Sequence, residues 1–274
     1  MKIEGCPFGE RPHKERADKV IVSRGLAPSH QKAQALIMAG LAFSEGQRIA
    51  KPGQMIDRNQ EISLRKEIPY VSRGGLKLEE ALDLFTIPIS GRVAADLGAS
   101  TGGFTDCLLK RGARKVYAVD VETRQIDWHL RGDPRVIILE KNARYLKKED
   151  FGEGLDIVTT DLSFISVLKV LPAIKEFLGK GELLSLLKPQ FEVGKHQVGK
   201  KGIVKDPSLH EEVLNRVSCE AYKIGFKLRG LIKSSIRGQK GNREFFIYWS
   251  LGEDLYTPNE AKALIKEVVW NEKD

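Results

Sequence analysis

Four charged residues could carry out proton-transfer chemistry together. Asp161 and Lys188 each end a predicted apolar strand, Glu244 opens another strand, and Lys77 lies on a predicted helix. A single charged residue at a strand end usually meets only solvent. Two lysines and two carboxylates at one rim are harder to explain as solvated strand ends, and side chains of these types can act as general acids and bases.

A glycine-rich loop, residues 98–103, follows a predicted strand, and Asp96 stands two positions before its first glycine. Glycines let the backbone turn sharply and approach a ligand, at the strand ends where open α/β sheets bind ligands. The G-x-x-x-G-G spacing differs from the G-x-G-x-x-G of dinucleotide sites. A second strand ends at Asp120, whose carboxylate could accept both ribose hydroxyls of a nucleoside. The predicted cofactor-binding residues are Asp96, Gly98, Ala99, Ser100, Thr101, Gly102, Gly103, Phe104, Asp120, Val121, Asn142 and Ala143.

The composition is typical of a globular protein, with 30% charged and 41% hydrophobic residues among 274. This length allows one medium domain and a small one. Apolar runs stay well below the roughly 18 residues of a membrane span, and residues 1–6 lack the apolar core of a signal peptide. We therefore expect a cytoplasmic protein. The three cysteines and five histidines show no metal-ligand spacing, so we expect no metal site.

The net charge of +8 is unevenly distributed. Residues 1–67 carry 12 basic and 8 acidic side chains, and residues 184–243 carry 13 and 5, whereas residues 68–183 are balanced. A basic stretch can be only a solvated helix face. Two basic regions around a neutral centre instead favour a polyanionic partner.

Strands and helices are predicted to alternate from Val93 onward, which is typical of an α/β protein with a doubly wound sheet. A seven-stranded Rossmann-like domain is expected. Its predicted strands are 93–97, 115–119, 135–139, 155–160, 182–187, 226–233 and 244–250, and its predicted helices are 74–85, 103–111, 122–130, 165–178, 208–225 and 258–270.

Residues 16–64 form a separate pattern. Ser29 is a predicted N-cap for a helix over residues 31–39, which Gly40 closes, and short strands are expected at 41–43, 47–49 and 61–64. This pattern resembles the small α+β RNA-binding domain of ribosomal protein S-four type, although His30 and Leu41 stand where that family usually has basic or polar residues. The alternative role is a packing accessory. The expected divisions are a leader 1–15, this domain 16–67, a linker 68–73 and a catalytic domain 74–274.

Four motifs, Ser72–Lys77, Gly98–Phe104, Asp161–Ser166 and Lys188–Glu192, resemble the TlyA family. That family comprises ribosomal RNA 2′-O-methyltransferases with an FtsJ-like domain, some of which are called haemolysins. The resemblance covers nearly all of residues 15–270. It implies S-adenosylmethionine as cofactor with Asp96 facing its cationic methionine end, a Lys-Asp-Lys-Glu tetrad formed by the four charged residues above, and cytidine as the target.

The implied reaction accounts for these residue types. A ribose hydroxyl is a poor nucleophile, so a base must withdraw its proton. Lys188 could be that base if burial and a second cation, Lys77, favour its neutral form. The Leu-Ser-Phe after Asp161 is unlike the Asn/Asp-Pro-Pro-Tyr/Phe of amino-nitrogen methylation, and this loop lacks the cysteine that carbon-5 methylation requires. Oxygen therefore remains as the methyl acceptor.

RNA contacts are expected on both parts of the chain. Phe164 is either a core side chain or one that stacks on a flipped base. Glycines and lysines alternate over residues 193–205, which indicates either a plain surface loop or one that closes on phosphates. The predicted RNA-binding residues are Arg16, Lys19, Arg24, Lys32, Arg73, Arg144, Phe164, Lys195, Lys200 and Lys201.

Three alternatives to this function have different consequences in the sequence. A non-catalytic RNA-binding protein could lose a tetrad residue, but all four are present. A membrane-active haemolysin would need an apolar span or a strongly amphipathic membrane helix, and an enzyme acting on a small molecule would not need a basic front domain. We therefore expect ribosomal RNA or ribosomal subunits as partners, with no membrane and no obligate protein partner.

Overall fold

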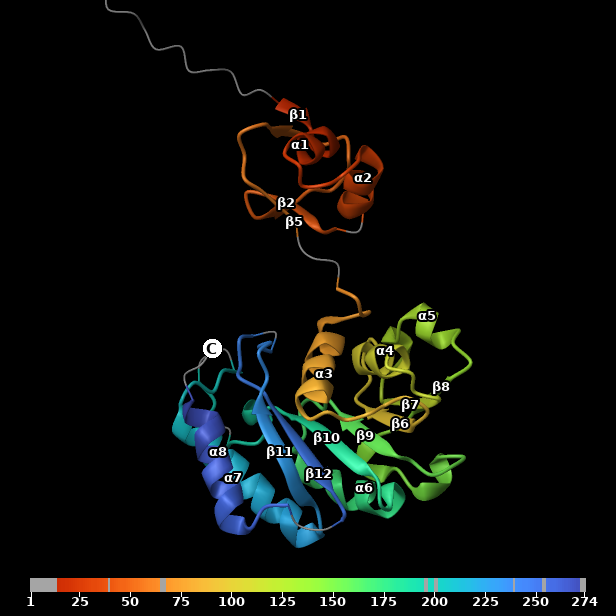
Figure 1. Cartoon of the computed structure of the whole chain (residues 1–274), viewed down its shortest axis with the longest axis vertical. Helices are drawn as coiled ribbons and strands as arrows, with labels where there is room; N and C mark the ends of the chain where they lie inside the picture. Colours follow the sequence, from red (N-terminus) through yellow and green to blue (C-terminus); the bar gives the residue numbers. More distant parts are fainter. Residues whose placement is uncertain are drawn as a thin grey trace, which may run out of the picture. The chain divides into compact units, whose positions relative to one another are not determined.

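The computed structural model describes residues 14–38, 40–64, 68–194, 197–199, 202–238, 240–252 and 255–271. The chain divides into two compact units, residues 1–67 and residues 68–274, each with its own hydrophobic core (Figure 1). The two units are described separately below.

The first unit contains two helices and five short strands. Its α1 and α2 bury Ile21 and Ile37 in a small core. Ser29 Oγ accepts the Lys32 amide, as predicted for an N-cap, and Gly40 follows the helix with φ of +74°. The pairing of β1 with β4, which the sequence analysis did not predict, begins inside the expected leader. The elements are β1 (Lys14–Arg16), α1 (Ala17–Ser23), α2 (His30–Met38), β2 (Ala42–Ser44), β3 (Gln47–Arg48), β4 (Met55–Asp57) and β5 (Ile62–Leu64).

The second unit is built on a seven-stranded sheet in the order β11-β12-β10-β9-β6-β7-β8. Strands β6 to β10 are mutually parallel, whereas β12 runs antiparallel to both β10 and β11. The predicted α/β fold is confirmed. Its strands are β6 (Val93–Leu97), β7 (Lys115–Asp120), β8 (Val136–Glu140), β9 (Ile157–Thr160), β10 (Glu182–Leu187), β11 (Lys227–Lys233) and β12 (Phe245–Ser250); its α-helices are α3 (Arg73–Leu84), α4 (Gly103–Lys110), α5 (Trp128–Arg131), α6 (Leu171–Leu178), α7 (Pro207–Ile224) and α8 (Pro258–Trp270).

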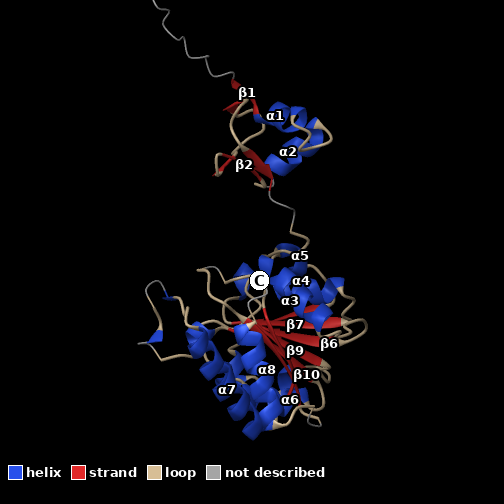
Figure 2. Cartoon of the chain, turned by 60° about the vertical axis from the view of Figure 1, so that its left-hand side comes forward, coloured by secondary structure: helices blue, strands red, loops and turns tan. Residues whose placement is uncertain are grey.

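Helices cover both faces of this sheet (Figure 2). Side chains of β6 alternate between the faces, since Val93 and Ala95 belong to one core and Ala94 to the other. Helices α3 and α4 pack on the face of Ala94, and α6, α7 and α8 pack on the opposite face. A strand buried on both faces has to be apolar throughout, which explains why β6 reads Val-Ala-Ala before its acid.

Two predicted helices are wrong in extent. The expected helix 122–130 is a 3₁₀ turn, Thr123–Gln125, followed by the short α5, because Asp127 is extended and its amide bonds to Thr101 O. The expected helix 165–178 starts only at Leu171, after a 3₁₀ turn over Val167–Lys169. Proline fits the first turn of a helix but not its interior, so Pro172 marks this start.

Candidate active site

The glycine loop lies at the switch point of the sheet, where β6 leads to β7 on one side and has β9 on the other. Open α/β sheets bind ligands at this place. Gly98 has φ of +87°, and a Cβ there would lie 2.8 Å from the carbonyl oxygen of Asp161. Only glycine therefore allows the loop after β6 to pass so close to the loop after β9.

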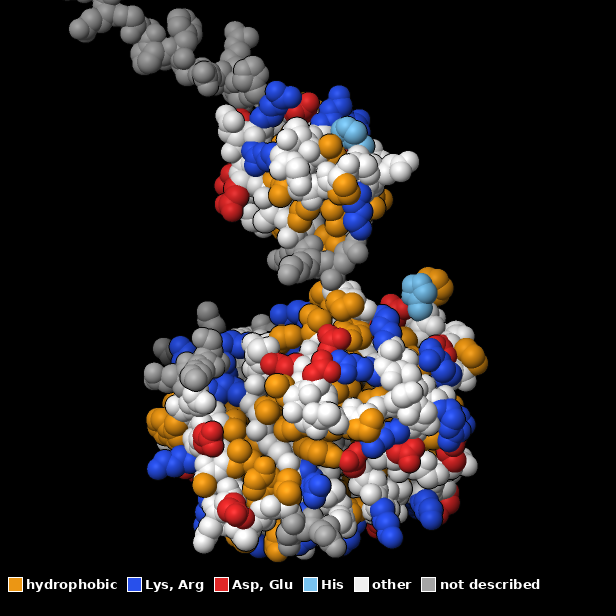
Figure 3. Space-filling model, in the orientation of Figure 1, with side chains coloured by type: hydrophobic (Ala, Val, Ile, Leu, Met, Phe, Trp, Pro, Cys, Tyr) orange, Lys and Arg blue, Asp and Glu red, His pale blue; other side chains and the backbone are white. Residues whose placement is uncertain are grey.

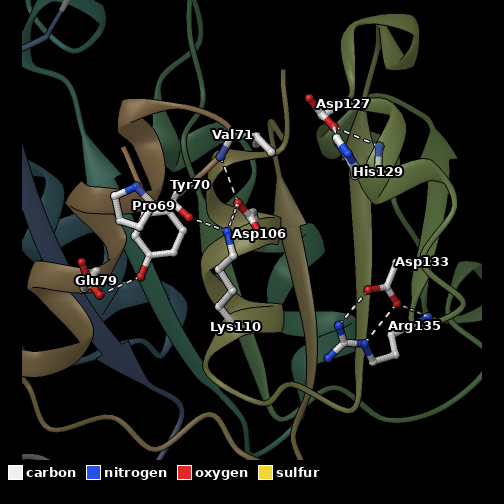
Figure 4. Close-up of polar contacts among 10 residues, drawn as sticks. All are labelled: Pro69, Tyr70, Val71, Glu79, Asp106, Lys110, Asp127, His129, Asp133 and Arg135. Carbon is white, nitrogen blue, oxygen red and sulfur yellow. Dashed lines mark hydrogen bonds and ion pairs between the residues drawn. The ribbon is translucent and has the colours of Figure 1, made fainter. Parts of the chain in front are cut away.

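The segment before α3 is fastened to α3 and α4 (Figure 4). The Val71 amide donates to Asp106 Oδ2 at 2.9 Å, and Tyr70 Oη donates to Glu79 at 2.7 Å. Lys110 on α4 bonds to both Asp106 and the carbonyl oxygen of Pro69. These contacts place the start of α3 beside the glycine loop, and Lys77 follows in the next turn of this helix.

The structure brings the four predicted catalytic residues together as two ion pairs around one cavity. Lys77 Nζ donates to Glu244 Oε2 at 2.6 Å, and both side chains are at least 90% buried. Lys188 Nζ lies 2.7 Å from Asp161 Oδ1, at angles outside those of a hydrogen bond, and donates to Ser163 Oγ at 3.1 Å. The antiparallel direction of β12 is what brings Glu244, at the start of its strand, to the rim where parallel strands end.

Asp96 lies beneath the glycine loop and does not line the cavity. It is fully buried and accepts a 2.7 Å hydrogen bond from Thr105 Oγ1 on α4. Burial raises its pKa to about 7, which the Thr105 bond opposes and the nearby charge of Asp161 reinforces. From the sequence we expected this carboxylate to face the cationic end of the cofactor, but in the structure it is not exposed to the cavity.

Asp120 supports the glycine loop from the neighbouring strand. Its Oδ2 accepts the Ser100 amide at 2.8 Å and its Oδ1 accepts the Glu122 amide at 2.9 Å. Each oxygen keeps acceptor capacity for a further donor such as a ribose hydroxyl. Asn142 caps the turn after β8 by accepting the Arg144 amide. Five predicted cofactor residues besides Asp96 do not line the cavity: Gly102, Asp120, Val121, Asn142 and Ala143.

The cavity has a volume of about 790 Å³. This is within the roughly 300–1,000 Å³ of small-molecule sites. Backbone from the glycine loop and the start of α3 lies so close that a Cβ at Gly103 would lie 2.2 Å from Ser72 Oγ. A narrow glycine-lined cradle that opens onto two lysine–carboxylate pairs fits a nucleoside-type cofactor beside a second, polar substrate. The predicted cofactor residues that line it are Gly98, Ala99, Ser100, Thr101, Gly103 and Phe104.

Phe164 is not a core residue, since its side chain is 90% exposed. It lines the cavity, its ring centroid lies 5.0 Å from that of Phe191, and its backbone has φ of +64°. A positive φ is costly for a bulky residue and persists only where surrounding structure imposes it. An exposed aromatic ring held under strain beside Lys188 is available to stack on a base.

The other predicted RNA-binding residues are dispersed. Arg73 lines the cavity, and Arg144 lies exposed over the Tyr145 ring. In the first unit Arg16 is committed to an ion pair with Asp18, and Arg24 bonds to the carbonyl oxygen of Arg58. Figure 3 shows Lys and Arg side chains on the visible face of this unit. The positions of Lys195, Lys200 and Lys201 lie outside the described residues, but Val198 and Gly202 from the same segment line the cavity.

Several polar residues that line the cavity were not among the predicted site residues, including Ser163, Gln190 and Lys240. Gln190 lies in the wall next to Lys188, and its buried Oε1 has no hydrogen-bond partner among the residues that the structure describes. Lys240, between β11 and β12, lines the same cavity. Gln190 falls inside the motif Lys188–Glu192, so its place in that motif was the available signal. The hairpin of Lys240 could be placed at the site only once β12 was known to be antiparallel.

Within the part of the chain that the structure describes, no helix is both long and apolar enough to cross a bilayer. Among the same residues, no group of three or more His, Cys, Asp or Glu side chains could hold a metal ion.

Comparisons with known proteins identify the family of this chain. The model of the FtsJ-like methyltransferase family matches residues 70–251. The Bacillus subtilis protein named "Putative rRNA methyltransferase YqxC" is 45% identical over 91% of this chain and 88% of its own length. The Mycobacterium tuberculosis protein "16S/23S rRNA (cytidine-2'-O)-methyltransferase TlyA" is 44% identical over 85% of this chain and 88% of its own length.

A solved structure from Streptococcus thermophilus, named "Putative hemolysin", has a TM-score of 0.71 and 41% identity, and the match covers 94% of this chain and 96% of that one. Relatives in this group thus carry both methyltransferase and hemolysin names. The family match spans the glycine loop and all four tetrad residues described above. The chain belongs to the TlyA family of FtsJ-like, S-adenosylmethionine-dependent methyltransferases.

Proposed function

We propose that this protein transfers the methyl group of S-adenosylmethionine to the 2′-hydroxyl of cytidine in ribosomal RNA, in the cytoplasm. The observation that carries the proposal is the pair of lysine–carboxylate contacts, Lys77 with Glu244 and Lys188 with Asp161, on one cavity with the glycine loop. The relatives' names supply the RNA and the nucleotide.

The chemistry assigns different tasks to the two lysines. The cofactor, when bound along the glycine loop, would supply an electrophilic methyl group. Lys188, after giving up its own extra proton, would accept the proton from the ribose O2′ as the carbon–oxygen bond forms. Its amine lies 2.7 Å from Asp161 Oδ1 and donates to Ser163 Oγ, and its side chain is 13% exposed. Asp161 would orient it.

Lys77 would act as a fixed positive charge. Its ammonium group is buried against Glu244, whose other oxygen faces the backbone of Gly238. A buried, paired cation keeps its place and contributes to orienting the ribose without needing to release a proton. Because methyl transfer is an in-line displacement between bound partners, such positioning supplies much of the acceleration.

The substrate base and the RNA backbone would be held by other residues. Phe164 would stack on the target base after it leaves its helix. Arg73 at the cavity and Arg144 on the rim, together with the basic first unit, would contact phosphates, which position RNA without reading its sequence.

The test is methylation of purified 30S and 50S ribosomal subunits with methyl-labelled S-adenosylmethionine. Mass spectrometry of the digested RNA should find 2′-O-methylcytidine with the wild-type protein and none with Lys188→Ala. Label on a base, or binding of subunits without any label transfer, would exclude the proposal. Label confined to small molecules would point to a different substrate class.

A further inference from the structure

Glu192 connects the two loops that carry the catalytic pair Lys188–Asp161. It lies just beyond β10, and its side chain is only 3% exposed. Its Oε2 accepts Ser166 Oγ at 2.7 Å and its Oε1 accepts the Val167 amide at 2.8 Å. A single carboxylate thus holds the end of the loop that follows β9.

The buried carboxylate is itself held from α7. Arg216 lies 3.6 Å from Glu192 Oε2 and donates to the backbone carbonyl oxygen of Glu192 at 2.7 Å. Burial raises the pKa of Glu192, which the bonds from Ser166, Val167 and Arg216 oppose. Burying a carboxyl group costs free energy unless hydrogen bonds satisfy its oxygens. The bonds to Glu192 therefore belong to the packed interior and are not a chance contact at the surface.

The loop that Glu192 holds contains the strained Phe164. Between Asp161 and Ser166 the backbone must turn through the positive φ of Phe164, which leaves the ring almost wholly exposed. Both the backbone strain at Phe164 and the exposure of its aromatic ring to water cost free energy, so neither would persist unless other contacts maintained it. The Phe191 ring, one residue before Glu192, is the one described aromatic contact of Phe164. The Glu192 bonds and this ring contact therefore fix the loop from the same short segment.

We infer that Glu192 is a positioning residue that holds Phe164 in its base-stacking conformation, through its bonds to Ser166 and Val167. The inference rests on the proposed function in so far as Phe164 stacks on an RNA base. The effect of Glu192 on the conformation of Phe164 can be measured independently of that function. Glu192 lies behind the loop and does not line the cavity, so it acts on the substrate only through Phe164 and its neighbours.

The direct test places 4-fluorophenylalanine at position 164 and records its fluorine resonance. One narrow signal is expected in the otherwise wild-type protein. Glu192→Gln keeps the shape of the side chain but removes its negative charge, and its NH2 group can meet Ser166 Oγ only as a donor, so neutral and weaker bonds replace the charge-assisted ones. Several signals or a shifted, broadened one are expected. An unchanged signal in the folded variant would overturn the inference, whatever the protein's substrate.

The kinetic test uses a double-mutant cycle in single-turnover methylation of ribosomal subunits. Glu192→Gln should slow transfer by about one to two orders of magnitude, as small misplacements of a reacting partner do. It should leave the affinity for S-adenosylmethionine unchanged. In a Phe164→Ala background the same change should cost little more, because its effect passes through that ring. Equal losses in both backgrounds would show a purely structural role and contradict the inference.

Two controls keep these outcomes separate. Glu220→Gln, an exposed acid of α7 paired with Lys223, should behave as wild type. Ser166→Ala removes one of the loop's two bonds to Glu192, together with the bond from the Leu168 amide to Ser166 Oγ, and should show a smaller loss in the same direction, which covers the case that Glu192→Gln does not fold. Absence of 2′-O-methylation by the wild-type protein would instead reject the proposed function, and the fluorine measurement would still decide the inference.

Discussion

Lys188 differs from Lys77 in what lies around its ammonium group. Lys77 is buried against Glu244, whereas Lys188 also bonds to Ser163 at the cavity. Lys188→Arg keeps the positive charge but cannot lose its proton in practice. Single-turnover methylation should therefore fall nearly as far as in Lys188→Ala, by about 10²-fold or more for loss of a general base.

Calorimetry separates this chemical defect from a binding defect. Affinity for S-adenosylmethionine should stay close to wild type in Lys188→Arg, and Lys262→Arg on the exposed side of α8 should keep full activity. A Lys188→Arg protein that methylates at the wild-type rate would show that this lysine only positions the substrate.

Asp96 should make the stability of the protein depend on pH. Burial raises its pKa from 3.8 to about 7, so the folded state holds this proton at a pH where the unfolded chain has lost it. The stability that protonated Asp96 provides is complete below about pH 4 and is lost as pH rises through 7. Urea unfolding should therefore show wild type losing free energy of unfolding relative to Asp96→Asn between about pH 5 and pH 8. Parallel pH curves for the two proteins would contradict the raised pKa.

The glycine loop is the element whose backbone geometry most constrains the site. Gly98→Ala adds strain at a positive φ, of order 1–2 kcal/mol, and drives its Cβ to 2.8 Å from the Asp161 carbonyl oxygen. Relief of this clash must displace the loop after β6, the loop after β9, or both. Affinity for S-adenosylmethionine should therefore fall at least about tenfold. Titration calorimetry measures this directly.

Gly91 offers a matched control for that substitution. It also has a positive φ, of +77°, but a Cβ there would meet nothing within 4 Å. Gly91→Ala should lower the thermal midpoint by a similar backbone penalty and leave cofactor affinity unchanged. Equal affinity losses in both variants would mean that backbone strain alone, and not the contact with Asp161, explains the effect.

The parallel strands could be predicted closely because apolar runs buried on both faces have few alternatives. Predicted strand 182–187 and helix 258–270 match β10 and α8. The two helix errors have different causes. The bond from Asp127 to Thr101 is a tertiary contact that breaks one predicted helix and leaves no periodic pattern in the sequence. The late start of the other helix follows from Pro172, a local signal that the predicted bounds did not take into account.

The candidate site shows the same limit. Residue types and order identified the tetrad, and the structure brings all four to one cavity. Their pairing could not be predicted, because which carboxylate meets which lysine depends on the reversed direction of β12. Contacts behind the site, such as the bond between Ser166 and Glu192, connect loops that are distant in sequence. Such contacts leave no local pattern from which they could be predicted.

Across the whole molecule, the catalytic chemistry resides in the second unit, whereas basic charge is in excess in both units. The cavity is lined entirely by residues of the second unit, from Ile68 to Glu244, whereas the first unit has its own core and a basic excess. If the first unit binds RNA phosphates, it should contribute to RNA affinity and little to cofactor affinity. The salt dependence of RNA binding should then reflect how many phosphates this unit neutralises.

Removing residues 1–67 should therefore reduce methylation of ribosomal subunits far more than binding of S-adenosylmethionine. Fluorescence titrations from about 50 to 200 mM salt should give a shallower dependence of log affinity on log salt for the shortened protein, since it neutralises fewer phosphates. Lys19→Glu in the full chain is the milder counterpart, because it reverses one exposed charge of α1 and leaves the unit's core intact. Salt-independent binding by the full chain would exclude phosphate contacts, and equal losses of cofactor binding and methylation would assign the first unit a supporting role in the fold.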